Sequence, residues 1–150
     1  MNIIFDYYRT IFDPETGELY PKTYGILEKL SKEHKLFLFT YNEYDRAEFM
    51  KSSQIEKFFT KICLVDKKDK DNMLKVIDEA NSADTTLVVG DRVQSEIRIG
   101  NELGYETIWL KQGKFGKQLP SDPLEKPKYI IHSLGEIFNI LEKYKNNIGL

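Results

Sequence analysis

Short apolar runs alternate along the chain with stretches in which apolar residues recur at helical spacing. The runs are rich in Ile, Leu, Val and Phe and lack polar alternation, which is typical of strands covered on both faces of a sheet. They predict six strands, at residues 2–5, 35–40, 61–65, 85–90, 106–110 and 129–131. This alternation of strands and helices predicts an α/β fold with a doubly wound, mainly parallel sheet.

The stretches between the strands predict amphipathic helices, each with one apolar stripe that faces the sheet. Three such stripes, in chain order, are Met73, Ile77 and Ala80; Val93, Ile97 and Gly100; and Leu134, Ile137, Phe138 and Leu141. Further helices are expected at 23–33, with Leu27 and Leu30 facing inward, and at 43–52. Helices on both faces of the sheet would give a three-layer sandwich.

Two segments interrupt this alternation. Between Thr10 and Pro21, turn-forming residues that include Asp13 and Gly17 predict a hairpin. Between 112 and 128, two glycines and three prolines predict a long loop that leads to the last strand. Apart from these segments, the order of strands and helices is regular.

The composition fits one compact domain. The chain has 150 residues, of which 41% are hydrophobic and 31% are charged, so a single unit over residues 1–150 is expected. Its 22 Lys and Arg residues against 24 Asp and Glu residues give a formal net charge of -2. The sequence therefore has no excess of positive charge that would indicate a nucleic-acid-binding surface.

Membrane insertion and secretion are not expected from the sequence. The longest apolar runs, such as 36–39, fall far short of the ~20 residues that span a bilayer. Asp6 interrupts the apolar start of the chain where a signal peptide has its hydrophobic centre, so a cytoplasmic location is expected. Cys63 is the only cysteine, which excludes an intramolecular disulfide and a thiolate zinc cluster.

The carboxyl ends of the predicted strands carry polar residues that suit phosphate chemistry, and ligands bind at these ends in open α/β sheets. Asp6 follows the first strand, Thr40 ends the second, lysines follow the third and Asp91 follows the fourth. Carboxylates hold a divalent cation or offer a nucleophile, while hydroxyl and ammonium groups bind phosphate oxygens. Each residue alone is common as a structural cap, so the hypothesis depends on the order of all four.

This order resembles the four motifs of the haloacid dehalogenase (HAD) superfamily. The corresponding segments are FDYYRTIFD, LFLFTYN, a lysine and VVGDRVQSEI. The resemblance continues through GNELGYETIWLKQGKF to PKYIIHSLGEIFNIL and so covers nearly the whole chain. It implies a HAD-like Rossmannoid fold. A phosphoaspartate receiver domain is also doubly wound, but this sequence lacks its paired acids after the first strand and its aspartate after the third.

The resemblance implies a role for each motif residue. Asp6 would be the nucleophile that forms an aspartyl phosphate, activated by a bound cation, Mg²⁺. Asp91 would hold this ion together with Asp6 and the backbone carbonyl of Tyr8, and Glu96 would bind the ion or orient its waters. Thr40 would donate a hydrogen bond to the transferring phosphoryl group.

The resemblance leaves the motif-three lysine and the substrate contacts open. Lys67 or Lys70 would be this lysine, with Lys67 favoured by its distance from the apolar positions of the next helix, and Lys68 is a third candidate. Thr10, Asn42 and Lys70 are candidate substrate-binding residues. Asn42 could equally cap the following helix.

Tyr8 departs from the phosphatase pattern, in which a second aspartate at this position acts as general acid and base. A phenol has a pKa near 10, so it can donate a proton but rarely activates water near neutral pH. Losing such a group typically costs ~10²- to 10⁴-fold in rate. The sequence therefore predicts a magnesium-dependent phosphohydrolase with slow turnover.

Two other functions stay open. Tyr8 also fits a HAD scaffold that no longer turns over and instead binds a phosphorylated or protein partner. Haloacid dehalogenases themselves resemble this chain in Tyr8, Phe12 and Asp13. Against a dehalogenase, Asp91 stands in a metal-type motif that halide displacement does not require.

The spacing of the motifs leaves no room for the cap domain of many HAD proteins. Only 29 residues separate Thr10 from Thr40, and 26 separate Thr40 from Lys67. In the family, capless members act on large substrates or close their sites by oligomerising. The expected partner is a phosphorylated substrate, with an open site that admits macromolecules, and oligomerisation stays open.

Overall fold

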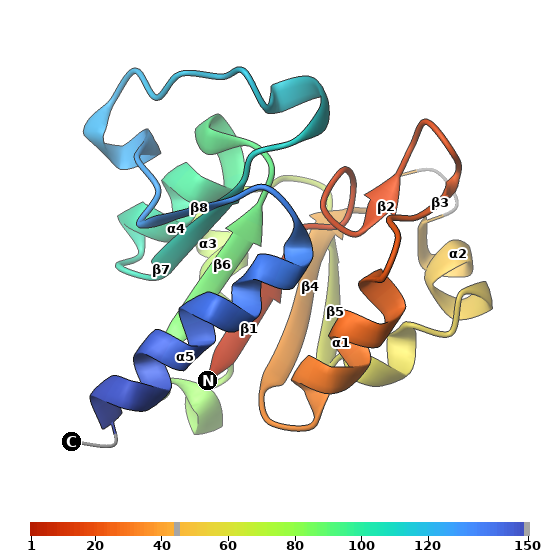
Figure 1. Cartoon of the computed structure of the whole chain (residues 1–150), viewed down its shortest axis with the longest axis horizontal. Coiled ribbons are helices and arrows are strands. Elements are labelled where there is room, and N and C mark those ends of the chain that lie inside the picture. Colours follow the sequence, from red (N-terminus) through yellow and green to blue (C-terminus); the bar gives the residue numbers. More distant parts are fainter. Residues whose placement is uncertain (44–45, 149–150) are drawn as a thin grey trace.

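A six-stranded parallel sheet forms the centre of the computed structural model, which describes residues 1–43 and 46–148 (Figure 1). Its strands, in chain order, are β1 (Asn2–Phe5), β4 (Lys35–Tyr41), β5 (Lys61–Val65), β6 (Thr86–Gly90), β7 (Glu106–Leu110) and β8 (Tyr129–Ile131). Their order across the sheet is β5-β4-β1-β6-β7-β8, with every neighbouring pair parallel. The predicted doubly wound α/β fold is confirmed, and each predicted strand agrees to within one residue.

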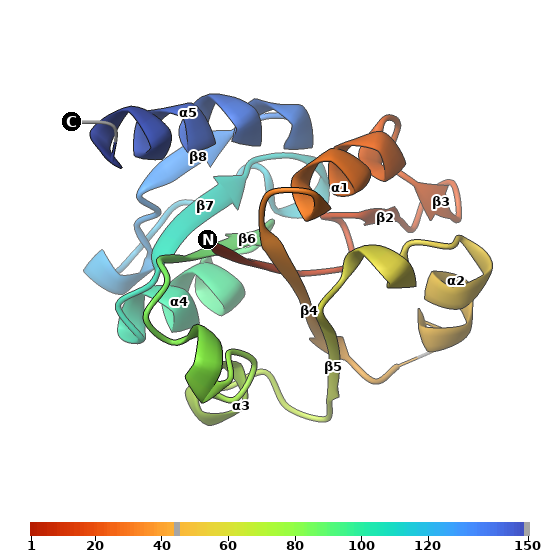
Figure 2. The same ribbon diagram turned by 90° about the horizontal axis from the view of Figure 1, so that it is seen from below.

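Helices cover both faces of this sheet, as a three-layer sandwich requires. They are α1 (Thr23–Ser31), α2 (Arg46–Ser52), α3 (Lys70–Leu74), α4 (Arg98–Glu102) and α5 (Ile137–Ile148). Figure 2 shows α1 and α5 on one face and α3 and α4 on the other. The expected helix at 43–52 is described only from Arg46, because residues 44–45 lie outside the described part of the chain.

Alternate residues of each central strand enter opposite cores. Ile3 and Phe5 of β1 pack in the core that contains Leu27 and Leu30 of α1. Ile4, between them, packs in the core that contains Met73. All six side chains are 2% exposed or less, which explains why the strands are continuous apolar runs.

The predicted helical stripe of Met73, Ile77 and Ala80 is wrong as a helix beyond its first residue, although Ile77 still packs against the core that contains Met73. Helix α3 ends at Leu74, and Ala80 is exposed in a short 3-10 turn over Glu79–Asn81. The side chain of Asp78 accepts a hydrogen bond from the backbone N–H of Asn81 at 3.1 Å. Such local side-chain bonds compete with helix continuation, so the chain restarts as a capped turn.

Both irregular segments lie beside the carboxyl ends of the strands (Figure 1). The predicted hairpin is formed by β2 (Phe12–Asp13) and β3 (Glu18–Leu19), which pair antiparallel. Gly17 adopts a φ of 73° in its turn, a conformation that glycine adopts without steric cost. The predicted loop at 112–128 contains only two short 3-10 turns, Gly113–Phe115 and Pro123–Glu125.

The described helices are short for a membrane protein. The longest, α5, has 12 residues. No helix among residues 1–43 and 46–148 combines the length and apolar character that crossing a bilayer requires. Cys63 is half-buried in β5, and burial raises the pKa of its thiol, which agrees with a structural role.

Candidate active site

Asp6 lies directly beyond β1, where the sheet presents its carboxyl ends. Its backbone N–H donates to the carbonyl of Val89 in the neighbouring β6 at 3.0 Å. Its side chain is 4% exposed, and the hydroxyl of Thr10 donates to its Oδ2 at 3.4 Å. The first strand thus holds one buried carboxylate at the switch point of the doubly wound sheet.

Two further buried acids come from the turn that follows β6. Asp91 is the next residue after the strand, and its carbonyl accepts a hydrogen bond from Trp109 Nε1 at 3.0 Å. Glu96 lies in a π-helical turn, Val93–Ile97, a rare geometry that recurs at functional sites. One carboxylate oxygen from each of Asp6, Asp91 and Glu96 lies within 4.8 Å of the other two. We call these three residues the acid trio.

Lys68 is the cation that reaches the acid trio. Its Nζ lies 2.5 Å from Asp6 Oδ1 and 2.6 Å from Glu96 Oε1. Burial alone would lower the pKa of Lys68, but the charges of Asp6 and Glu96 outweigh burial and raise it. Lys68 therefore stays charged and offsets part of the negative charge of the trio.

The sequence favoured Lys67 for this position, and the structure places Lys67 in an exposed turn instead. Asp69 caps α3, because its side chain accepts a hydrogen bond from the N–H of Asn72 at 2.8 Å. This cap fixes where the helix starts and turns the residue just before it, Lys68, toward the sheet. Lys70, the first residue of α3, is exposed.

The acid trio carries uncompensated negative charge. Three carboxylates and one ammonium sum to a formal charge of -2 when all are ionised. Burial, followed by the charge of Asp6, raises the pKa of both Asp91 and Glu96. Among the described residues, Asp91 Oδ2 and Glu96 Oε2 are buried without a hydrogen-bond partner. Buried carboxylate oxygens that lie close together without partners fit a divalent cation, which would favour the ionised form of both acids.

A second polar group, opposite the acids, is built from Thr40 and Arg46. Thr40 is fully buried near the end of β4, and its hydroxyl accepts from Arg46 Nη1 at 2.7 Å. A hydroxyl that accepts one bond can still donate another. The Arg46 guanidinium also lies 4.6 Å from the centre of the Tyr8 ring. Arg46 therefore links the motif-two hydroxyl to Tyr8.

A hollow of about 390 Å³ opens above the acid trio, Lys68 and Arg46, whereas Thr40 is fully buried and does not line it. It is lined by Asp6, Tyr8, Arg9, Tyr41, Glu43, Arg46, Lys68, Asp91, Arg92, Ser95, Glu96, Lys114 and Phe115. Thr10 lies buried behind Asp6 rather than at this surface. Asn42 is exposed outside the hollow, and its backbone N–H donates to the carbonyl of Val65. The structure therefore does not bring Thr10, Asn42 or Lys70 to the hollow as substrate contacts.

Several residues that line the hollow belong to no motif and follow no spacing that would mark them in the sequence. Arg46 sits in an amphipathic helix where a charged residue is usually solvated, and only the tertiary fold turns it inward. Lys114 and Phe115 belong to the long loop, whose sequence lacks any periodicity. Ser95 donates to Glu96 Oε1 at 3.3 Å.

Replacing Gly90 by Ala should destabilise the site and the protein. A Cβ at Gly90 would lie 2.9 Å from both Cβ and Oε2 of Glu96. We expect the free energy of unfolding in urea to fall by about 1–3 kcal/mol, because a packed interior must shift. Gly25→Ala in α1 is the control, since its Cβ meets nothing within 4 Å and should stabilise by about 0.5–1 kcal/mol. Equal stability of Gly90→Ala and the unchanged protein would contradict the close packing.

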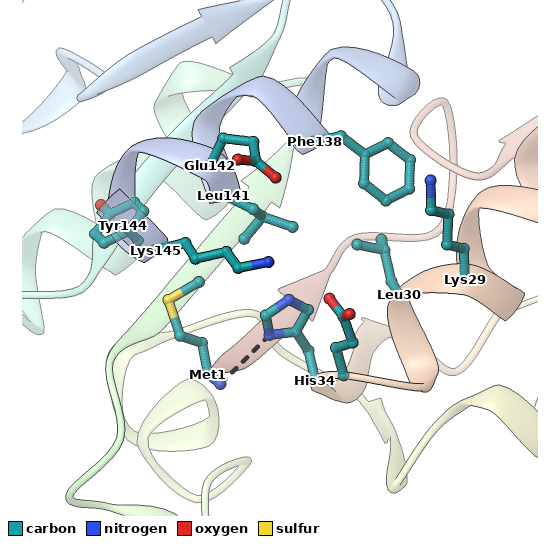
Figure 3. Close-up of a pocket in the computed structure, with 10 residues that line it drawn as sticks. Met1, Lys29, Leu30, His34, Phe138, Leu141, Glu142, Tyr144 and Lys145 are labelled. Atoms are coloured by element: carbon teal, nitrogen blue, oxygen red, sulfur yellow. Dashed lines mark hydrogen bonds between the residues drawn. The ribbon is translucent and has the colours of Figure 1, made fainter. Parts of the chain in front are cut away.

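A second hollow, of about 440 Å³, lies between α1 and α5 (Figure 3). Figure 3 shows Phe138 and Leu141 of α5 facing Leu30 of α1, with Met1 and His34 below them. Burial lowers the pKa of His34. This hollow adjoins the start of β1, at the end of the sheet opposite the acid trio. Ligands of open α/β sheets bind at the other end, so the acid-lined hollow is the candidate active site.

Part of the chain matches a known family of hydrolases. Residues 67–137 match the model of the HAD-hydrolase-like family. The glyceraldehyde 3-phosphate phosphatase of Methanocaldococcus jannaschii is 37% identical over 65 residues, which cover 43% of this chain and 27% of that protein. The chain thus spans about a quarter of the length of the curated relatives it matches.

Comparison with solved structures identifies the fold. YfnB of Bacillus subtilis, named as a HAD-hydrolase and solved with bound magnesium, gives a TM-score of 0.71 at 24% identity, over 85% of this chain and 58% of that one. An uncharacterized protein from Listeria monocytogenes serotype 4b gives a TM-score of 0.77 at 19% identity, over 97% and 99% of the two chains. The fold is HAD-like, and the family match supports a hydrolase of this superfamily.

Proposed function

We propose that this HAD-like protein is a magnesium-dependent phosphohydrolase that works slowly through an aspartyl phosphate on Asp6. The observation that carries the proposal is the acid trio, with two unpartnered buried oxygens and Lys68 in contact. The phosphatase name of the curated relative supports the same reaction class. An ordinary structural cluster would not leave two buried carboxylate oxygens unsatisfied.

The roles of the binding residues follow from their positions. In the first step a carboxylate oxygen of Asp6 forms a bond to phosphorus while the bond to the leaving oxygen breaks. Lys68 holds the attacking carboxylate in place and faces the incoming negative charge. Thr40 and Arg46 supply a hydroxyl and a guanidinium as donors to phosphoryl oxygens. Such donors stabilise charge that develops in the transition state.

The proposed metal ligands are the acid trio and the backbone carbonyl of Tyr8. When bound, Mg²⁺ would neutralise the trio together with Lys68 and let a negatively charged phosphate approach a carboxylate. Lys68 contacts Oε1 of Glu96 and leaves Oε2 available, so Glu96 can hold both the lysine and the ion. Asp91 Oδ2 is available in the same way.

Addition of Mg²⁺ should raise the melting temperature, because the ion binds the folded acid trio and not the unfolded chain. At ~100 times its Kd a ligand stabilises by about 2.7 kcal/mol, which corresponds to a shift of about 5–10 °C for a chain of this size. Differential scanning fluorimetry measures the shift. Asp91→Asn should remove most of it. Asp66→Asn, the same change on an exposed acid after β5, should retain it. An equal shift in both variants would reject the proposed ligands.

Slow turnover is proposed because Tyr8 stands where a second aspartate would transfer protons. The phenol can donate its proton to the leaving oxygen in the first step. The second step needs a base that takes a proton from the attacking water, and a neutral phenol does not serve as one. We therefore propose that the aspartyl phosphate accumulates during turnover.

We propose that residues 1–150 form a single domain without a cap domain. The described residues between Thr10 and Thr40 form the hairpin, α1 and β4. Those between Thr40 and Lys68 form α2, a 3-10 turn over Glu56–Phe58 and β5. Neither segment contains a separate helical domain among its described residues, which supports an open site.

Tyr8 also favours a second candidate, a HAD-like scaffold that binds a phosphorylated or protein partner without turnover. A protein that binds Mg²⁺ and phosphate esters but releases no phosphate would support this candidate over the enzyme. The dehalogenase alternative predicts halide release from a 2-haloacid without added metal. Absence of halide in that assay would remove it.

A further inference from the structure

Three cations surround the mouth of the candidate active site and share one aromatic ring. The guanidinium of Arg92 lies 4.7 Å from the centre of the Phe115 ring, that of Arg9 lies 5.6 Å away, and Lys114 Nζ lies 5.5 Å away. Arg9 also lies 4.9 Å from the Tyr8 ring. All three line the same hollow as the acid trio. We call Arg9, Arg92 and Lys114 the cationic rim.

The cationic rim lacks ion-pair partners among the described residues. In the described part of the chain, none of its three residues forms an ion pair, whereas Arg98 and Lys128 elsewhere on the surface are paired with glutamates. The whole chain has a formal charge of -2, so its overall charge does not explain this local gathering. Cations held over aromatic rings keep their charge available for an anion.

The rim is also fixed in place by the backbone. Arg9 adopts a φ of 65°, in the left-handed region that residues other than glycine rarely occupy. Its N–H donates to the carbonyl of Phe12 at 2.8 Å, and its own carbonyl accepts from Gln112 Nε2 at 3.3 Å. The second bond ties the segment that follows β1 to the loop that carries Lys114. Backbone strain of this kind is concentrated at ligand-binding sites.

We propose that the cationic rim binds a second anionic group of the substrate, so that the preferred substrates are small phosphate monoesters with a second phosphate or a carboxylate. This inference rests on the proposed phosphohydrolase function. The transferring phosphoryl group would lie on the floor, near Asp6 and Thr40, and the second anion would meet the rim. Guanidinium groups bind both phosphate and carboxylate in a bidentate manner.

The size and surroundings of the hollow favour a small substrate over a polymer. Its volume of about 390 Å³ falls in the range of small-molecule sites. Asp13 and Glu15 line an adjoining hollow together with Arg9 and Lys114. A long polyanion that left the rim on that side would meet these two acids and be repelled. A compact substrate whose second anionic group ends at the rim avoids them.

The affinity order of three matched ligands tests the inference without requiring turnover. Isothermal titration calorimetry of the Asp6→Asn protein with Mg²⁺ would use propyl phosphate, 3-(phosphonooxy)propanoate and propane-1,3-diyl bisphosphate. We expect the bisphosphate to bind about 10- to 100-fold more tightly than propyl phosphate, the ratio for a charge-assisted contact. The affinity of 3-(phosphonooxy)propanoate, compared with that of the bisphosphate, shows whether the rim binds a carboxylate or a phosphate more tightly. Equal affinities, or no binding of the bisphosphate, would overturn the inference.

Rim variants in the same Asp6→Asn background show where the preference comes from. Arg9→Asn keeps a residue that tolerates the left-handed conformation, and Arg92→Gln keeps a polar chain of similar length. Combined, they should reduce the affinity ratio at least about 5-fold, since two charge-assisted contacts are lost. Phe115→Leu should cause a smaller reduction of the affinity ratio, because it removes the ring that all three cations contact. Lys117→Gln, an exposed lysine of the same loop outside the hollow, should leave it unchanged.

An unchanged ratio in the double rim variant, or an equal loss in Lys117→Gln, would overturn the inference. Failure of the proposed function is distinguishable from this result. If the Asp6→Asn protein shows the expected affinity order but the unchanged protein releases no phosphate, the inference about the rim stands. Only the phosphohydrolase proposal is then rejected.

Discussion

Asp6→Asn is expected to abolish magnesium-dependent phosphate release, with a loss of about 10⁴-fold or more, as for other nucleophile replacements. Asp6 is the acid of the trio that contacts both Lys68 and Thr10, with Lys68 at Oδ1 and Thr10 at Oδ2, so each carboxylate oxygen has one donor. The amide has nearly the same shape but no negative charge to attack phosphorus. It also removes one proposed metal ligand, which adds to the loss.

The measurement is the rate of phosphate release from p-nitrophenyl phosphate and, because a relative is named for it, from glyceraldehyde 3-phosphate. Asp66→Asn makes the same chemical change on an exposed acid beyond β5 and should retain the rate. Circular dichroism of both variants verifies that they fold. Equal activity of Asp6→Asn and the unchanged protein would reject Asp6 as the nucleophile and, with it, the proposed enzyme.

Tyr8→Asp is expected to raise steady-state turnover by about 10²- to 10⁴-fold, the usual contribution of a positioned general acid and base. Tyr8 lines the hollow beside the trio, and its ring is flanked by the guanidinium groups of Arg9 and Arg46. A carboxylate between two guanidinium groups would remain ionised and could accept the proton of the attacking water. The gain should fall on the second step, the hydrolysis of the aspartyl phosphate.

Rapid-quench kinetics separates the two steps. The unchanged protein should release one equivalent of nitrophenol in a burst, followed by a slow steady rate, whereas Tyr8→Asp should show a faster steady rate and a smaller burst. Tyr8→Asn has the shape of aspartate without its basicity and serves as the control. If Tyr8→Asn accelerates turnover as much as Tyr8→Asp, space rather than proton transfer limits the reaction.

The fold could be predicted from the sequence because both sides of the central strands are buried. Runs such as Leu36 to Phe39 have no polar position that would permit another register or another element. The prediction was wrong where local hydrogen bonds decide, as at Asp78, whose side chain restarts the chain in a 3-10 turn. The spacing of apolar residues contains no information about such a hydrogen bond.

The site was predictable where it follows directly from strand ends and not where it depends on loops. Asp6, Thr40 and Asp91 come at or directly after a strand, so the sheet itself brings them together. The choice of Lys68 depends on the Asp69 cap, which sets the start of α3 and leaves Lys67 exposed. Arg46 enters the site only because the fold brings its guanidinium to the Thr40 hydroxyl near the end of β4. Neither placement has a signal in residue spacing.

The central position of β1 has a consequence for how the protein folds. Asn2 pairs with Lys35 on one side and with Thr86 on the other, so the innermost strand forms only contacts between distant parts of the sequence. Folds with such high contact order fold slowly, since long loops must close before their contacts stabilise the chain. Asp6 meets Asp91 only after β6 has docked. A nascent or truncated chain that ends before β6 would therefore contain Asp6 without Asp91 and Glu96, and we expect it to release no phosphate.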